Sequence, residues 1–165
     1  MNDKMKNLNI KESLLNALRG FADAFERERN LRIHLSAASL ISAFAYVYGT
    51  DRTGAAVLML TIALVIFAEL VNSAVEKAVD TATDKLRFDA MHAKDYAAAA
   101  VLVTAVGAIG VGIALFGDLK RIYAALCTIA SDAGLIILFV FILAADLAML
   151  MYPFIKNRIL RGKNR

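Results

Sequence analysis

The stretch AELVNSAVEKAVD, residues 68–80, lies where a membrane helix is expected to end, and it carries several polar residues. It continues an apolar run that begins at Gly54, yet it holds two glutamates, an asparagine and an aspartate. An ionisable group at the depth of the lipid tails is costly, and it usually faces a cavity or a partner. Glu69 lies deepest, because a turn of mostly apolar residues separates it from Glu76 and the helix end. We therefore interpret this stretch as part of a functional site.

The composition is that of a membrane protein. Of the 165 residues 59% are hydrophobic, above the roughly 45–50% of soluble domains, and the mean hydropathy is +0.59. A spanning helix needs roughly 20 apolar residues, and four runs have that length. The sequence predicts an all-α integral membrane fold with membrane helices at about residues 32–49, 54–80, 94–117 and 133–152.

An N-terminal amphipathic helix is expected ahead of these spans, at about residues 10–28. Leu14, Leu18, Phe21 and Phe25 recur at helical spacing, and charged residues occupy the other faces. Such a helix lies on the inner membrane surface, and the alternative is a helix packed on the protein's own cytoplasmic side. The chain then divides into two parts: a core at 1–117, and an outer loop, fourth helix and basic cytoplasmic tail at 118–165.

The basic residues predict the orientation in a bacterial cell membrane. With a cytoplasmic N-terminus, sixteen of the 19 lysines and arginines fall in cytoplasmic segments, and the outer side keeps Arg52, Lys120 and Arg121. Cytoplasmic flanks carry such an excess, so both termini and the middle loop are expected inside. Because these charges are spread over three membrane flanks, they are a poor fit to nucleic-acid binding.

Five polar residues of the second membrane helix share one face. At about 100° per residue they fall within an arc of about 100°, and Asp80 lies roughly 16 Å along the axis from Glu69. Hard carboxylate oxygens suit Mg²⁺, which commonly takes one or two of them plus substrate phosphates. Lys94, Arg29 and Arg32, from the adjoining polar segments, are expected to neutralise phosphate charge. The polar face consists of Glu69, Asn72, Ser73, Glu76 and Asp80.

Two polar or small-residue features inside the later spans have structural interpretations. Gly107, Gly110 and Gly112 lie in an uncharged membrane run, where small residues let helices approach closely. Asp146 lies in the inner half of the fourth helix, and we interpret it as a polar residue held against neighbouring helices or a partner.

The polar pattern of residues 69–80 and the segment after it resemble a known family. The pattern E-x-x-N-[ST]-A-[IV]-E-x-x-V-D, followed by a charged loop and "AKD" opening the third helix, resembles the prokaryotic diacylglycerol kinase and undecaprenol kinase family of membrane lipid kinases. The resemblance covers about residues 12–117 and is specific, because the pattern fixes polar residues within membrane. "ERNLRIH", residues 28–34, is similar to the undecaprenol kinase branch, and the preceding Arg27 is variable.

The resemblance implies a homotrimer with active sites shared between subunits at the inner membrane surface. It implies that Glu69 is the base that accepts the lipid hydroxyl's proton, with Asn72 beside it as a second catalytic residue. It implies that Glu28 and Glu76 hold Mg²⁺ on the ATP phosphates. The ATP-binding positions that match the family are Glu28, Glu76, Asp80, Lys94 and Asp95.

Two departures from the family pattern limit what can be carried over. The loop reads "KLRFD" at residues 85–89 where the family commonly has a Glu-Tyr-His string, and we interpret His92 as a solvated loop residue. His34 is interpreted as the start of an interfacial helix and not as a ligand. Most members end after three membrane helices, whereas this chain adds a fourth.

The expected function is ATP- and Mg-dependent phosphorylation of a membrane lipid alcohol, with undecaprenol as first candidate and diacylglycerol as alternative. A transporter would continue its ionisable residues across the outer half of the membrane, and 57–67 and 101–116 are apolar there. A membrane adaptor would leave Glu69 without a role. The expected partners are therefore the lipid, ATP and further copies of the chain, with no nucleic acid.

Overall fold

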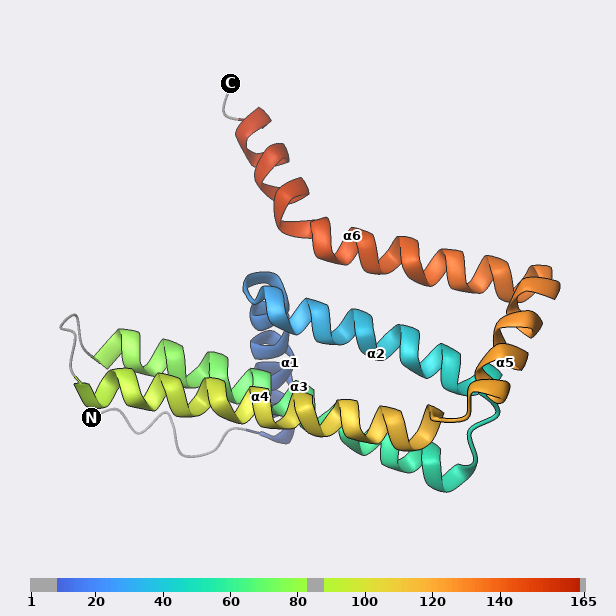
Figure 1. Ribbon diagram of the computed structural model, residues 1–165. Coiled ribbons are helices and arrows are strands. Elements are labelled where there is room, and N and C mark those ends of the chain that lie inside the picture. Colours follow the sequence, from blue (N-terminus) through green and yellow to red (C-terminus); the bar gives the residue numbers. More distant parts are fainter. Residues whose placement is uncertain (1–8, 83–87, 164–165) are drawn as a thin grey trace.

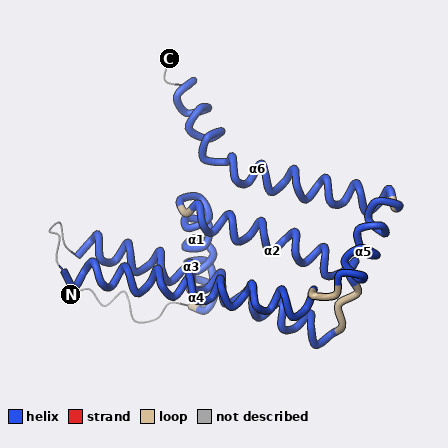
Figure 2. The backbone as a smooth tube through the Cα atoms, in the orientation of Figure 1, coloured by secondary structure: helices blue, strands red, loops and turns tan. Residues whose placement is uncertain are grey.

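The computed structural model describes residues 9–82 and 88–163, with side chains described as far as Phe154. The described residues are helices and short connections, without a strand (Figures 1 and 2). Six helices follow one another: α1 (Ile10–Arg27), α2 (Arg29–Tyr48), α3 (Arg52–Ala82), α4 (Phe88–Phe116), α5 (Leu119–Ser131) and α6 (Ala133–Lys163).

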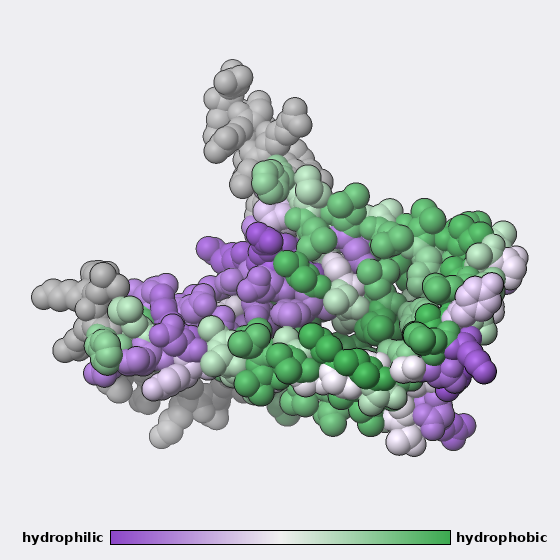
Figure 3. All heavy atoms as spheres, in the orientation of Figure 1, coloured by the Kyte–Doolittle hydropathy of each residue, from purple (hydrophilic) through white to green (hydrophobic). Residues whose placement is uncertain are grey.

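The long helices run side by side, and α2 lies between an α3–α4 hairpin and α6 (Figure 1). The short helix α1 crosses the bundle at the start of α2, and the end of α3 and the start of α4 extend beyond it (Figure 1); we call this region the polar end. Helix α5 crosses the opposite end and connects α4 to α6. Hydrophilic residues gather toward the polar end, and hydrophobic residues cover the long helices beside it (Figure 3).

Four helices of the described chain are long and apolar enough to cross a membrane. They are Arg29–Tyr48, Arg52–Ala82, Phe88–Phe116 and the first part of α6, Ala133–Phe154. The all-α membrane fold predicted from the sequence is thus confirmed. The α4 and α6 spans are each only 6% buried within the subunit, so most of their surface is left to lipid or to other protein chains.

Local sequence signals explain the turn between α2 and α3. Gly49 ends α2 at φ +73°, a left-handed conformation that glycine adopts without strain. Asp51 then caps α3, because its Oδ1 accepts a hydrogen bond from the backbone N of Gly54 at 2.8 Å. A methyl group on Gly54 would lie 2.7 Å from Thr50 Cγ2, so this tight turn also requires a glycine inside α3.

Aromatic packing closes the bundle at the α5 end. The Phe116 ring of α4 packs edge-on against Tyr48 and Phe44 of α2, with centroids 5.1 and 5.5 Å apart. Arg121 of α5 lies over the Tyr48 ring at 4.2 Å and donates to the carbonyl oxygens of Tyr48 and Gly49. These contacts hold the end of α2 against α4 and α5.

The C-terminal part differs from the prediction in two respects. The expected outer loop is the helix α5, whose N-cap Asp118 accepts hydrogen bonds from the backbone N of Lys120 and Arg121. The fourth membrane helix, expected at about residues 133–152, agrees with the apolar span Ala133–Phe154, but the tail after it continues as helix to Lys163. Pro153 lies inside α6, and Figure 1 shows this helix bending toward the C-terminal end, as a proline in a helix produces.

Asp146 fits its interpretation as a polar residue held against neighbouring helices. It is buried in the contact between α6 and α2, where the hydroxyl of Ser39 lies 3.0 and 2.9 Å from its two carboxylate oxygens.

The three glycines of α4 were interpreted as positions of close helix packing, and they do not have that role within the subunit. A methyl group on Gly107, Gly110 or Gly112 would have no atom within 4 Å, so no described helix approaches them closely.

Candidate functional site

The site is built around Glu69 on α3. Glu69 is 2% exposed, and with Leu31 it is one of the two largest fully buried side chains described. Its Oε2 has no hydrogen-bond partner among the described residues. A buried carboxylate without a full set of partners is costly, and such groups are retained mainly where they act on a ligand.

The residues around Glu69 come from α2 as well as α3. The Glu69 carboxyl group interacts electrostatically with His34, Glu28 and Glu76. The side chain of Asn30 lies beside it. Glu28 precedes the first turn of α2 as its N-cap, and Asn30 and His34 lie four residues apart in α2, on one face. The start of α2 therefore faces the polar face of α3.

The next turn of α3 continues the polar face that the sequence predicted. Asn72 and Ser73 are buried, at 8% and 4% exposure. The Asn72 amide nitrogen donates to Glu76 Oε1 at 3.0 Å, while Asn72 Oδ1 has no partner in the described chain. Asn72 thus holds the Glu76 carboxylate in place and leaves a carbonyl oxygen available.

Lys77 links this face to helix α1. Its ammonium lies 2.9 Å from Asp23 Oδ2 of α1 and 3.9 Å from Glu28 Oε1. The hydrogen bonds from Lys77 and Arg27 lower the pKa of Asp23 below its ordinary value. Neither Lys77 nor Asp23 was among the site residues taken from the sequence, although both lie at the polar end.

The remaining predicted residues lie further along the helices. Asp80 and Lys94 form an ion pair of 2.5 Å between α3 and α4, and Asp95 is exposed near the start of α4. Asp80 is one turn beyond Glu76, roughly 6 Å along the α3 axis. The structure therefore brings together Glu69, Asn72, Glu76 and Glu28, and places Asp80, Lys94 and Asp95 as an outer group on the same end.

Two sequence interpretations at this end are wrong. Arg32 was expected to neutralise phosphate, but it is 4% exposed and donates from Nη1 to the carbonyl oxygens of Phe25 and Glu26, at 2.7 and 2.9 Å. It stabilises the junction of α1 and α2 instead. His92 was expected in a solvated loop, but it lies in α4 between the rings of Phe88 and Tyr96. Of the "KLRFD" loop, residues 85–87 lie outside the described part.

The oxygen donors at the centre suit a hard cation. No three His, Cys, Asp or Glu side chains within residues 9–82 and 88–154 converge to form an all-protein metal cage. Two carboxylates, Glu28 and Glu76, and the free Asn72 oxygen are nevertheless the type of donor that Mg²⁺ prefers. Mg²⁺ is commonly held by one or two carboxylates together with substrate phosphates, so this donor set fits a metal that arrives with a nucleotide.

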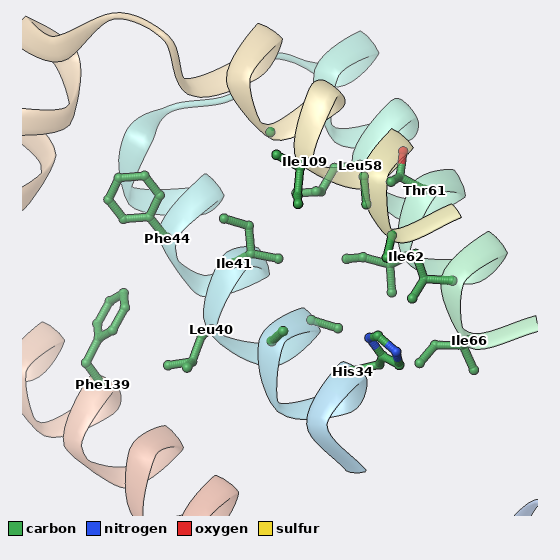
Figure 4. A pocket seen from close by; sticks show the side chains of 16 residues that line it. His34, Leu40, Ile41, Phe44, Leu58, Thr61, Ile62, Ile66, Ile109 and Phe139 are labelled. Atoms are coloured by element: carbon green, nitrogen blue, oxygen red, sulfur yellow. The ribbon is translucent and has the colours of Figure 1, made fainter. Parts of the chain in front are cut away.

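An apolar cavity of about 620 Å³ leads away from this polar group (Figure 4). Its walls come from α2, α3 and α4, with one residue from α6. At one end His34 and Ile66 lie side by side, one turn of α3 before Glu69 (Figure 4). His34 was missed as a site residue because a single sequence does not show which residues of neighbouring helices meet.

The comparisons with known proteins agree on one family. Residues 15–116 match the family model of prokaryotic diacylglycerol kinases. A protein named diacylglycerol kinase from Synechocystis sp. is 37% identical over 105 residues, which make up 63% of this chain and 60% of that protein. A protein named undecaprenol kinase from Bacillus subtilis is 33% identical over 105 residues, or 64% of this chain and 85% of that protein. No solved structure matches the chain significantly.

The fold and the site define a multi-pass membrane protein with a buried acidic site at one end of its helices. The chain belongs to the prokaryotic diacylglycerol kinase family. The match covers α2, α3, α4 and most of α1, and all of the predicted site residues. Helices α5 and α6 lie outside it, and the chain spans less than two thirds of the Synechocystis relative.

Proposed function

We propose that this protein transfers the γ-phosphoryl group of ATP to the hydroxyl group of a membrane lipid alcohol, with Mg²⁺ as cofactor. One observation carries the proposal: Glu69 is a buried carboxylate with a free oxygen, placed between an apolar cavity and an acidic polar end. The family and the names of the relatives support a lipid as the substrate and a phosphoryl transfer as the reaction.

The two substrates approach from different solvents. The hydroxyl of a lipid alcohol reaches the site from the bilayer, so its base has to lie within the apolar part of the helices. ATP is soluble, so the groups that hold its phosphates have to lie nearer to water. Glu69, Asn72 and Glu76 follow one another along α3 in that order, which meets both requirements on one helix.

Glu69 accepts the hydroxyl proton as the lipid oxygen attacks the γ-phosphorus. A bond forms between the lipid oxygen and phosphorus, the bond from phosphorus to the β-γ bridging oxygen breaks, and its electron pair leaves with ADP. A positioned general base contributes about 10²–10⁴-fold to such a reaction. The rest is positioning and neutralisation of phosphate charge, which a few polar side chains supply.

Glu28 and Glu76 hold Mg²⁺, which supplies positive charge to the ATP phosphates. Asn72 orients Glu76 through its hydrogen bond and keeps its Oδ1 toward the site. The exposed ion pair of Asp80 and Lys94, together with Asp95, contacts the nucleotide at the water-facing edge. A lysine carries a compact charge that suits phosphate.

Undecaprenol is the first candidate for the lipid. The "ERNLRIH" stretch is similar to the undecaprenol kinase branch, and the match to the Bacillus subtilis relative spans 85% of that protein. Diacylglycerol is the second candidate, because the Synechocystis relative has the higher identity, 37%. Both lipids are membrane alcohols, so the same base and the same cavity serve either.

The polar end faces the cytoplasm, with both termini on that side, and the protein acts as a homotrimer whose subunits share active sites. The excess of basic residues in these flanks supports the orientation. The 6% burial of the α4 span and the uncovered Gly107 and Gly110 support assembly, because a second subunit can pack there closely.

Transfer of labelled γ-phosphate by the purified protein in mixed micelles tests the proposal. Undecaprenol and diacylglycerol are offered in parallel, and the outcome expected is Mg-dependent labelling with a preference for undecaprenol. Glu69→Gln is the variant of the proposed base, and its matched control is Glu12→Gln, an exposed α1 position whose bond from the Asn9 backbone a glutamine also accepts. Labelling of neither lipid by protein that is shown to be folded would overturn the proposal.

A further inference from the structure

The C-terminal helix contributes one residue to the apolar cavity. Phe139 of α6 lines it, and the other lining residues come from α2, α3 and α4, which lie inside the family match. Figure 4 shows Phe139 on the side of α2 away from α3 and α4, with its ring near Leu40 and facing Phe44. The part of the chain that the family match leaves out thus forms one wall of the cavity.

A single polar contact and an apolar stripe fix this wall in place. The residues of α6 that turn inward are Leu135, Phe139, Ile142, Asp146 and Met149, at a helical repeat, whereas their neighbours are exposed. Asp146 meets the Ser39 hydroxyl of α2 at 2.9 Å. It lies two turns of helix from Phe139, about 10 Å along the axis, so the contact sets the register of Phe139 against α2.

The cavity is open between its walls. Within the described residues α6 packs on α2, α5 and α1 and does not pack on α4, although both helices flank α2 (Figure 1). The volume of the cavity lies inside the range of about 300–1,000 Å³ of small-molecule sites, and the cavity lining is almost wholly apolar. An apolar molecule can therefore enter from the side that faces the bilayer.

We propose that α6, through Phe139, forms a wall of the hydrocarbon site of the lipid substrate and limits the width of the chain accepted there. This inference rests on the proposed function. The occupant is the hydrocarbon segment next to the lipid hydroxyl, because the cavity ends at His34 and Ile66, one turn of α3 from the free Glu69 oxygen. The rest of the lipid chain extends into the bilayer through the open side.

Fluorescence quenching tests the location of the lipid without requiring turnover. The chain contains no tryptophan, so Phe139→Trp introduces a single reporter in the cavity. Phe141→Trp is the matched control, because Phe141 lies on the same helix and is 70% exposed. Each variant is placed in bilayers of ordinary phospholipid, and brominated diacylglycerol or brominated polyprenol is added at low mole fraction.

The expected result is saturable quenching of the Phe139→Trp variant by at least one brominated alcohol, reversed by the unlabelled alcohol. The Phe141→Trp variant should lose fluorescence only in proportion to the bulk amount of brominated lipid. Equal, non-saturable quenching of both variants would overturn the inference. So would the absence of quenching at position 139, which would show that a helix of another copy fills the cavity.

Kinetics test the width limit separately. Phe139→Ala should change the ratio of kcat/KM for undecaprenol and diacylglycerol by about tenfold or more, mainly through KM, because pocket shape discriminates by such factors. Phe141→Ala should leave the ratio unchanged, and an unchanged ratio in Phe139→Ala would contradict the width limit. If the wild type phosphorylates neither lipid while position 139 is quenched saturably, the proposed function fails and the lipid site stands. If the wild type phosphorylates a lipid while position 139 is not quenched saturably, the lipid site at Phe139 is wrong and the proposed function stands.

Discussion

Two buried carboxylates, Glu69 on α3 and Asp146 on α6, have opposite surroundings. Both oxygens of Asp146 lie within 3.0 Å of the Ser39 hydroxyl, in the contact between two helices. Glu69 is more deeply buried, at 2% against 7% exposure, and its Oε2 has no partner in the described chain. Burial alone therefore does not separate a structural acid from a reactive one. The separation comes from whether each carboxylate oxygen has a protein group within hydrogen-bond distance.

The surroundings of the two acids explain the difference. Asp146 faces a serine and an otherwise apolar contact, and the contact fixes one helix against another. Glu69 faces the start of α2, where His34, Asn30 and Glu28 are all polar, and an apolar cavity ends one turn away. The first arrangement stabilises a helix pair, and the second leaves an oxygen for a ligand.

The largest effect among the supporting residues is expected at Glu76. In Glu76→Gln the Mg²⁺ concentration for half-maximal transfer should rise about tenfold or more, because one charged ligand is lost. The Asn72 amide still has an oxygen to donate to, so the helix face should keep its structure. A magnesium titration of phosphate transfer measures this, with Glu12→Gln as the control. An unchanged Mg²⁺ requirement would remove Glu76 from the metal site.

A smaller effect is expected at the structural acid. Ser39→Ala removes the donor that Asp146 faces and leaves a buried carboxylate, which should lower the free energy of unfolding by about 1–2 kcal/mol. Thermal unfolding in detergent micelles measures the loss. Ser42→Ala, an exposed position on the same helix, is the matched control and should change little. Equal stability of the two variants would show that the Ser39 contact does not hold α6.

The smallest effect concerns helix α1. Asp23 has a pKa lowered by its bonds to Lys77 and Arg27, so its contribution to stability is complete above its unfolded pKa of about 3.9. That contribution is lost as the pH falls through the lower folded pKa. The protection of the α1 amides against hydrogen exchange, taken relative to the intrinsic exchange rate at each pH, should therefore fall a few-fold on acidification below about pH 4.

Asp23→Asn removes the titrating group, so α1 should exchange faster at neutral pH and lose most of this acid dependence. Asp89→Asn, an exposed position in the first turn of α4, is the control. Wild-type α1 protection that does not change with acid would show that the contacts of Asp23 with Lys77 and Arg27 contribute nothing in solution.

The sequence predicted the membrane helices and the polar face of α3, because both depend on one-dimensional repeats. Apolar runs of spanning length predicted the spans, and the spacing of Glu69, Asn72 and Glu76 predicted their shared face. It predicts a loop where α5 lies, because this helix is too short to span a membrane. Its N-cap signal, Asp118, was nevertheless present in the sequence.

What the sequence could not predict is which helices meet. His34, Phe139 and Ser39 become parts of the cavity or the α6 contact only through the packing of α2. Arg32 was misassigned because its charge indicated a phosphate, whereas the carbonyl groups at the α1–α2 junction accept its hydrogen bonds. Contacts between distant segments depend on tertiary structure, which spacing does not encode.

The most direct test compares the two acids in one assay. Single-turnover transfer of γ-phosphate from Mg-ATP to the lipid is measured for wild type, Glu69→Gln and Asp146→Asn, each shown to be folded by size-exclusion chromatography. Glu69→Gln should lose about 10²-fold or more of the transfer rate, and Asp146→Asn should stay within a few-fold of wild type. Substantial transfer by Glu69→Gln, or an equal loss in both variants, would contradict the assignment of the unpaired carboxylate as the base.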